Sequence, residues 1–288
     1  MKKVLFVTFF GIILIAFVIR IVGYRDGDDV STCVDSNESN IDSNKSSIYS
    51  IRSSSICTIC YHGFSVVYNI KTLQPESVEY TLTAQQVWAT DNTPIVSHHF
   101  MPDPNLSLPQ ASDEDYRGVN KLLGLSRGHM VPHQDMKWSL QSVQESDYYT
   151  NICPQNEKLN TKLWRKIENI TRKLATLYDS VHVICGPIFN DTVYGFIGPN
   201  RIPVPDFFYK TLLVRNANGY HAIAFYCPNN NLPLNIFETI CSVDNIESIS
   251  NIDVYSFLPD DVESEIEKQI SNIFFNNNII SSDSLKCN

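Results

Sequence analysis

The chain has 288 residues, of which 43% are hydrophobic and 11% aromatic, enough to build one large domain around a substantial core. Its 22 basic and 31 acidic residues give a formal charge of -9 at pH 7. This composition excludes a wholly disordered chain and a globally basic nucleic-acid coat protein, but it leaves room for a local basic groove.

The first 25 residues differ from the rest of the chain. Two lysines precede a mostly apolar run from Val4 to Ile19, which Arg20 closes. At about 1.5 Å per residue this run is short for a hydrocarbon core of about 30 Å, unless the next two residues extend it. Residues 1–25 are therefore predicted to be a signal peptide or, over residues 4–22, an N-terminal membrane anchor. The flanking charges predict an extracytoplasmic location, secreted or membrane-anchored.

Residues 26–55 are rich in Ser, Asn and Asp, so we expect a disordered tether there and the main domain at residues 56–288. Eight cysteines agree with an oxidising compartment, and a disulfide near the chain ends is expected, although the spacing does not define its pairing. The Cys57-x-x-Cys60 pair could instead form half of a zinc site, but a second such pair or a close His pair is lacking.

The central and C-terminal parts mix strand and helix patterns. Runs rich in β-formers at residues 64–70 and 77–83, separated by a turn containing proline, predict a hairpin, and further strands are expected at residues 181–186, 207–214 and 220–226. A helix is predicted over residues 157–177, with an apolar stripe formed by Leu159, Leu163, Ile167, Ile170 and Leu174. A second helix follows Pro259, with acidic residues in its first turn. Because there is no regular βαβ rhythm, we predict an α+β fold.

Basic residues concentrate in residues 117–173. Ten Lys and Arg residues face five acidic ones there, a local charge of +5 on an acidic protein. Such a segment suits a polyanion-binding cleft, because phosphate contacts supply most sequence-independent affinity for nucleic acid. A solvated helix face is the alternative.

Arg127 and His129 are two residues apart, so they share a face if this segment is extended. The guanidinium can hold a phosphate, and a largely neutral imidazole can take a proton from an attacking water. His133 lies four residues further on, but Pro132 argues against one continuous helix that carries both histidines as zinc ligands. We interpret His133 as structural or peripheral.

Asn160 and Glu168 are eight residues apart on the expected helix, about 80° around its axis, with Trp164 midway. An amide oxygen is a legitimate ligand for Mg²⁺, and a nearby carboxylate can orient the waters of that ion. The alternative makes Asn160 a helix cap and Glu168 a surface acid paired with Lys or Arg.

Several ordered motifs give these residues a context: SRGHMVPHQDMKWS at 126–139, TNICPQNEKLN at 150–160, the following W-x-x-x-E, DYRG at 115–118, VICGPIF at 183–189, RIPVPDFFYK at 201–210, AIAFYCPN at 222–229 and IESISNIDVYSFLP at 246–259. Together they resemble the DNA/RNA non-specific endonucleases, a family of ββα-metal-finger nucleases that includes secreted bacterial nucleases and mitochondrial endonuclease G. The resemblance implies a ββα-metal-finger fold, with a central, mainly antiparallel sheet flanked by helices.

The resemblance also implies roles for individual residues. His129 matches the general base, Asn160 the single protein ligand of a hydrated Mg²⁺, and Glu168 the carboxylate that holds the waters of the metal. Arg127 and Asn151 match residues that stabilise the phosphate and support the site. The implied activity is Mg²⁺-dependent hydrolysis of DNA and RNA, with Mn²⁺ as a substitute metal, that leaves 5′-phosphate and 3′-hydroxyl ends.

Substrate contacts are expected through the phosphate backbone, from Arg127, Lys137 and Arg165 of the basic segment. Members of the family are often dimers, so a homodimer is a candidate assembly, and a membrane is a further partner if residues 4–22 stay uncleaved.

Two departures from the family pattern keep other functions open. Ser126 stands where the family usually has Asp, and the expected upstream arginine is replaced by SHHFMPDP, in which His98 or His99 could substitute in part. The alternatives are a catalytically impaired nucleic-acid-binding or surface interaction protein on the same fold, and a phosphodiesterase that acts on small nucleotides.

Overall fold

The computed structural model describes residues 48–51, 55–90, 97–190, 195–275 and 279–280. One antiparallel sheet of eight strands dominates the fold, in the order β1-β2-β3-β4-β7-β10-β11-β12. These strands are β1 Ile48–Ile51, β2 Ile56–Cys60, β3 Ser65–Asn69, β4 Gln74–Thr83, β7 Ser180–Ile188, β10 Phe207–Asn216, β11 Gly219–Pro228 and β12 Ile240–Cys241.

The expected hairpin is confirmed as β3 and β4, and the three later strands as β7, β10 and β11. The chain reverses before the proline, because Leu73 adopts a left-handed backbone with φ of 56° and Pro75 already belongs to β4. β1 lies in the stretch that was expected to be a tether, and it pairs with β2. The division of the chain into domains stays a prediction.

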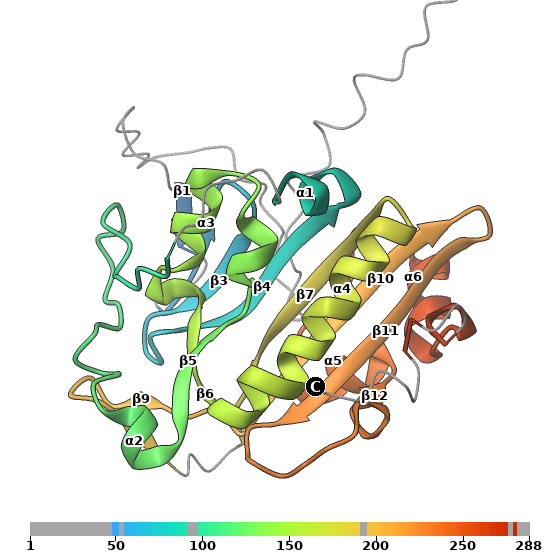
Figure 1. The fold of residues 1–288 in the computed structure, drawn as a ribbon. Helices are drawn as coiled ribbons and strands as arrows, with labels where there is room; N and C mark the ends of the chain where they lie inside the picture. The colour runs from blue at the N-terminus through green and yellow to red at the C-terminus, as the bar shows by residue number, and fades with distance from the viewer. Residues whose placement is uncertain (1–47, 52–54, 91–96, 191–194, 276–278, 281–288) are drawn as a thin grey trace, which may run out of the picture.

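Helices cover both faces of the sheet. On one face α4, Arg165–Leu177, packs against β4, β7 and β10; on the other, α5, Val243–Ser250, and α6, Asp260–Lys268, pack against β11 (Figure 1). The short helix α1, Ala84–Ala89, lies beside β4. Two 3₁₀ turns follow later in the chain, η5 at Ile236–Glu238 and η6 at Asn272–Phe274 near the C-terminus.

The predicted helix over residues 157–177 is confirmed in position, but it has two parts. A π-helical turn, η4, spans Leu159–Trp164 and continues directly into α4. Ile167, Ile170 and Leu174 of α4 are buried in the main core, as the apolar stripe predicts. Burying each such side chain stabilises the fold by about 1.5–3 kcal/mol relative to exposure, so packing holds this helix in place.

A second, two-stranded antiparallel sheet completes a ββα unit with this helix. β5, Leu125–His129, pairs with β6, Ile152–Asn156, and η4 begins three residues after β6. The connection between β5 and β6 contains η2 His133–Met136, α3 Leu140–Ser146 and η3 Tyr149–Asn151; α2 Val119–Leu123 leads into β5, and β8 Phe196–Ile197 pairs with β9 Ile202–Pro203. The predicted α+β class with a mainly antiparallel sheet is thus confirmed.

The structure bears on three further expectations: the N-terminal membrane segment, the disulfide and the zinc half-site. The apolar segment at residues 4–22 lies outside the described residues, and none of the helices in the described ranges is long and apolar enough to cross a bilayer. Six of the eight cysteines are described, and no disulfide joins any two of them. Cys57 is buried in β2, and burial raises the pKa of its thiol to about 11, which is unlike a zinc-ligating thiolate.

Candidate active site

A cleft of about 510 Å³ lies beside the ββα unit. Its walls are strand β5, the helix α2 before it, the turn η2, the helix η4–α4 and the segment at His98 and Phe100. The cleft brings together six of the seven residues that the sequence singled out: Arg127, His129, Lys137, Asn160, Arg165 and Glu168. The convergence follows from the fold, because antiparallel pairing sets the start of β5 beside the end of β6, where the helix begins. The helix then runs back along β5, so that Asn160 lies beside Ser126 and Trp164 beside His129.

Arg127 and His129 occupy alternate positions of β5, as expected for an extended segment, and both line the cleft. Arg127 donates from Nε to Tyr149 Oη at 3.1 Å and from Nη2 to Asp113 Oδ1 at 2.9 Å. Its guanidinium also lies 5.2 Å from the ring centroid of Tyr116. A cation held in this way is positioned for an anionic substrate and loses little side-chain entropy on binding.

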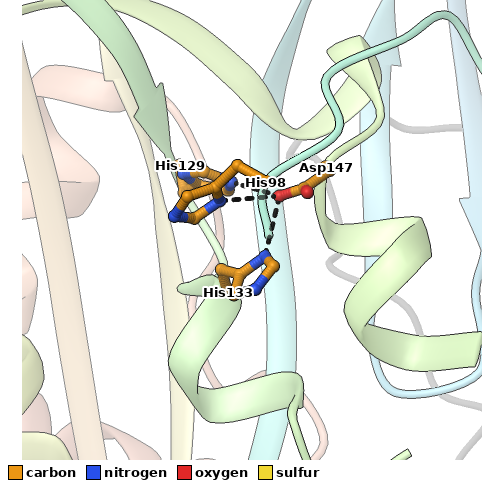
Figure 2. Close-up of side chains that lie close together, drawn as sticks. All are labelled: His98, His129, His133 and Asp147. Atoms are coloured by element: carbon orange, nitrogen blue, oxygen red, sulfur yellow. Dashed lines mark hydrogen bonds and ion pairs between the residues drawn. The ribbon is translucent and has the colours of Figure 1, made fainter. Parts of the chain in front are cut away.

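The ring of His129 is oriented by a carboxylate. Its Nε2 lies 2.9 Å from Asp147 Oδ1, and Asp147 is 2% exposed (Figure 2). Because an ionised carboxylate only accepts hydrogen bonds, the ring proton sits on Nε2, and Nδ1 is left as the basic nitrogen. Burial lowers the pKa of His129 and the bond to Asp147 opposes that effect, so the ring is neutral at pH 7.

Asp147 remains ionised although it is buried. Burial alone would raise the pKa of its carboxyl group, but hydrogen bonds from His129, His133 and His98 hold it well below its usual range. The backbone N–H of His99 donates to the other oxygen, Oδ2, at 2.6 Å. The carboxylate is therefore an ionised acceptor buried next to the ring of His129, which lines the cleft.

Asn160 is oriented by the serine that departs from the family pattern. Ser126 Oγ donates to Gln155 O at 3.2 Å, so it accepts from Asn160 Nδ2 at 3.0 Å. The NH₂ group of Asn160 is thus used in the hydrogen bond to Ser126. The carbonyl oxygen Oδ1 is the atom of this side chain that can ligate a cation. Ser126 thus supports the predicted ligand without the charge of an aspartate.

Glu168 lines the same cleft from the first turn of α4, and it is not a surface acid paired with a neighbour. Loss of hydration raises the pKa of its carboxyl group to about 7, with the nearby Lys210 opposing the shift and Asp135 adding to it. Lys210, Arg172 and Arg165 favour the charged form of this carboxyl group but do not offset its loss of hydration. A hard divalent cation beside Glu168 would favour the ionised carboxylate further.

Two buried contacts behind the cleft tie β5 to the helix and to the main sheet. Trp164 Nε1 donates to His129 O at 3.2 Å, and Lys210 Nζ donates to Met130 O at 3.3 Å. The ammonium of Lys210 lies 4.6 Å from the ring centroid of Trp164. Lys210 is completely buried, a position that the sequence pattern of its strand did not reveal.

Asn151 is the one predicted site residue outside the cleft lining. It is completely buried, and its amide clamps the loop after β5: Oδ1 accepts from Val131 N at 2.9 Å, and Nδ2 donates to Val131 O and Ser146 O. This places Asn151 behind the site, where it holds the backbone that follows His129.

Sequence reasoning did not identify Asp147, and it interpreted His133 as structural or peripheral. Both side chains, together with His98, meet at the end of β5, and His98 and His133 line the cleft. Pro132 separates His129 from the turn η2, so no single helix carries both histidines, as expected. The sequence feature that comes closest to indicating this cluster is that several His and Asp residues lie near one another in the basic segment 117–173.

Comparison with known proteins places this geometry in a family. The family model of DNA/RNA non-specific endonucleases matches residues 42–261. The chain belongs to the DNA/RNA non-specific endonuclease family. The site residues and the ββα unit all fall inside the matched range.

Related proteins agree with this assignment. The chain is 29% identical over 218 residues to "Nuclease 1, mitochondrial" of Schizosaccharomyces pombe, with 69% of this chain and 66% of the relative covered. It is 35% identical over 144 residues to "Nuclease EXOG, mitochondrial" of Xenopus laevis, with coverage of 46% and 39%. The match therefore spans less than two thirds of either relative.

A solved structure of an EndoG/EndoGI complex has the same fold, with a TM-score of 0.64 and 22% identity over 71% of this chain and 88% of that one. Both named relatives above are mitochondrial nucleases. The predicted extracytoplasmic location is wrong on this comparison, since a short apolar run behind two lysines does not define a compartment.

Proposed function

We propose that this chain is a metal-dependent endonuclease that hydrolyses phosphodiester bonds of both DNA and RNA. The observation that carries the proposal is the pinned ring of His129, set by Asp147 so that Nδ1 is basic, in the cleft that also holds Asn160 and Glu168. A neutral, oriented imidazole beside oxygen ligands and basic side chains suits the attack of water on a phosphate.

The residues present fit Mg²⁺ as the metal, with Mn²⁺ as a substitute. Asn160 offers its amide oxygen because Ser126 holds the NH₂ end, and Glu168 offers a carboxylate in the same cleft, whose pKa is raised to about 7 by burial. An oxygen donor set with few protein ligands suits an ion that keeps most of its water. Asn160 would be the direct ligand, and Glu168 would hold the waters of the ion.

In the proposed reaction, His129 Nδ1 takes the proton of the attacking water, and Asp147 stabilises the imidazolium that forms. When bound, the divalent cation supplies Lewis-acid stabilisation of the charge that develops on the phosphate and on the leaving 3′ oxygen. Cleavage on that side of the phosphorus leaves 5′-phosphate and 3′-hydroxyl ends.

Arg127, Lys137 and Arg165 would bind the substrate through phosphates. Contacts of this kind carry no direct base readout and do not require or exclude a 2′-hydroxyl, so both sugars and most sequences are accepted. Asn151 would act from behind the cleft by holding the loop that follows His129.

The test is cleavage of plasmid, linear, single-stranded and RNA substrates by the full chain, with Mg²⁺ and with a chelator. His129→Ala should lower kcat by about 10²–10⁴-fold. His99→Ala is the matched control, because its side chain is exposed and outside the cleft lining.

Undiminished cleavage by His129→Ala would refute the assignment of the base. Binding of polymer without cleavage in either metal would favour the impaired, binding-only protein. Faster turnover of dinucleotides than of polymers would favour a small-nucleotide phosphodiesterase.

A further inference from the structure

Three histidines from separate parts of the fold surround one carboxylate oxygen. His129 Nε2, His133 Nδ1 and His98 Nδ1 lie 2.9, 2.9 and 3.2 Å from Asp147 Oδ1. These four atoms all lie within 4.8 Å of one another. Figure 2 shows the three rings converging on the same oxygen.

This arrangement is crowded for hydrogen bonds alone. A carboxylate oxygen has two lone pairs in its plane, so the three ring N–H groups compete for Oδ1, and at least one of the three hydrogen bonds lies off the lone-pair directions. A cation at the centre of the four atoms removes the competition, because each imidazole then offers a lone pair instead of a proton. Asp147 is ready for this role, since His99 N–H holds Oδ2 and turns Oδ1 toward the rings.

We propose that His98, His129, His133 and Asp147 bind a zinc-class transition-metal ion at a site separate from the oxygen ligands of Asn160 and Glu168, and that this ion switches the nuclease off. Three imidazoles and one carboxylate favour Zn²⁺ and its neighbours over Mg²⁺. A regular tetrahedron with ligand distances of about 2.0–2.1 Å has edges of about 3.3–3.4 Å. The N···O distances of 2.9–3.2 Å need to open by only a few tenths of an ångström, and the ring nitrogens, which lie within 4.8 Å of one another, need to draw together around the ion.

The fold supplies these ligands from four different places. His98 precedes the bridge at Met101, His129 ends β5, His133 begins η2 and Asp147 caps the C-terminus of α3. Side-chain exposure is 2% for Asp147, 6% for His133, 12% for His129 and 53% for His98. Three ligands are thus rigidly set, and the exposed His98 gives an ion a path to the site.

The switch follows from the position of one proton, and it rests on the proposed role of His129. Without a transition metal, the proton is on Nε2 and Nδ1 can accept the proton of water. An ion that binds Nε2 takes the lone pair there, so the proton of the neutral ring moves through solvent to Nδ1. No net proton is released, but Nδ1 no longer has a lone pair to act as base.

The test measures Co²⁺ and Zn²⁺ binding to the full chain, using the visible absorption of tetrahedral Co²⁺ and its displacement by Zn²⁺ in excess Mg²⁺. We expect one ion per chain, and affinity reduced by at least about 10–100-fold in His133→Ala and in His98→Ala. His98→Ala removes the exposed ligand, so it keeps the test valid if the buried variant fails to fold. His99→Ala is the matched control, and Asn160→Ala should retain Zn²⁺ binding.

Activity gives the second readout. Zn²⁺ should inhibit cleavage by the wild type, and the His98→Ala and His133→Ala variants, each normalised to its own rate without zinc, should need at least about tenfold more Zn²⁺. Equal binding by wild type and both variants, or loss of binding in Asn160→Ala, would overturn the site. Zinc binding without inhibition of an active chain would overturn the switch. Binding by a chain that cleaves nothing would keep the site and refute the proposed nuclease function instead.

Discussion

Replacing Asp147 by Asn isolates the effect of one buried charge on His129. The two side chains have almost the same shape, and Asp147 Oδ1 lies 2.9 Å from His129 Nε2. An asparagine carries no charge and can turn its NH₂ group toward Nε2, which stabilises the tautomer with its proton on Nδ1. That tautomer cannot take a proton from water.

The expected loss in kcat is about 10³-fold, or roughly 4 kcal/mol of transition-state stabilisation. It lies within the contribution of about 10²–10⁴ for general bases and just below the loss of about 10⁴ for the same change in a serine-protease triad. Because Arg127, Lys137 and Arg165 are unchanged, KM for DNA should stay within about threefold.

The pH dependence of cleavage by Asp147→Asn gives a second, independent prediction. Burial lowers the pKa of His129 and Asp147 raises it, so removing the carboxylate moves this pKa further down. The acidic limb of the remaining activity should therefore shift to lower pH, while the plateau falls.

The assay is the initial rate of plasmid cleavage in Mg²⁺ across pH, with thermal unfolding recorded for each variant. Asp179→Asn is the control, because Asp179 is exposed and its φ of 65° suits asparagine. A folded Asp147→Asn chain that keeps more than about a third of the wild-type kcat would refute the argument from the tautomer.

Three further perturbations address other parts of the molecule. Ser126→Ala removes the acceptor of Asn160 Nδ2, so the Mg²⁺ concentration for half-maximal cleavage should rise about tenfold; an unchanged metal dependence would contradict the orienting role. Glu168→Gln keeps the shape of the side chain but loses its charge, so cleavage at saturating Mg²⁺ should fall by about 10–100-fold, which a titration with Mg²⁺ and Mn²⁺ measures. Burial and neighbouring acidic groups raise the pKa of Glu267 from 4.5 to about 9, so its contribution favours the folded state at low pH and is lost as pH rises through that window. Glu267→Gln should therefore stabilise the chain by about 1–3 kcal/mol near pH 8 and by much less near pH 5, as urea unfolding with a chelator present would show.

Local patterns predicted most of the framework. The hairpin, the later strands and the helix over residues 157–177 depend on periodicities within ten to twenty residues, and packing did not override them. The π-helical turn at Leu159–Trp164 was not predicted, because it is a local widening of a pattern that reads as α-helix.

Some residues of the candidate site could be predicted from local patterns, and others could not. Arg127 and His129 follow from the spacing on one strand, and Asn160 and Glu168 from one helix. Asp147 reaches the site because the C-terminus of α3 lies beside the end of β5. His98 reaches it because the segment before the bridge at Met101 also lies there. Contacts between such distant segments depend on tertiary packing and leave no local signature.

The helix that carries Asn160 and Glu168 also buries Ile167, Ile170 and Leu174 in the main core. Local fraying does not free these two side chains, because the helix that holds them is anchored in the main core by its buried residues. The amides of α4 are therefore expected to exchange hydrogen slowly, through global opening, while the exposed end of the cleft at His98 exchanges fast. Catalytic competence and the folded state should consequently disappear together in a single cooperative step.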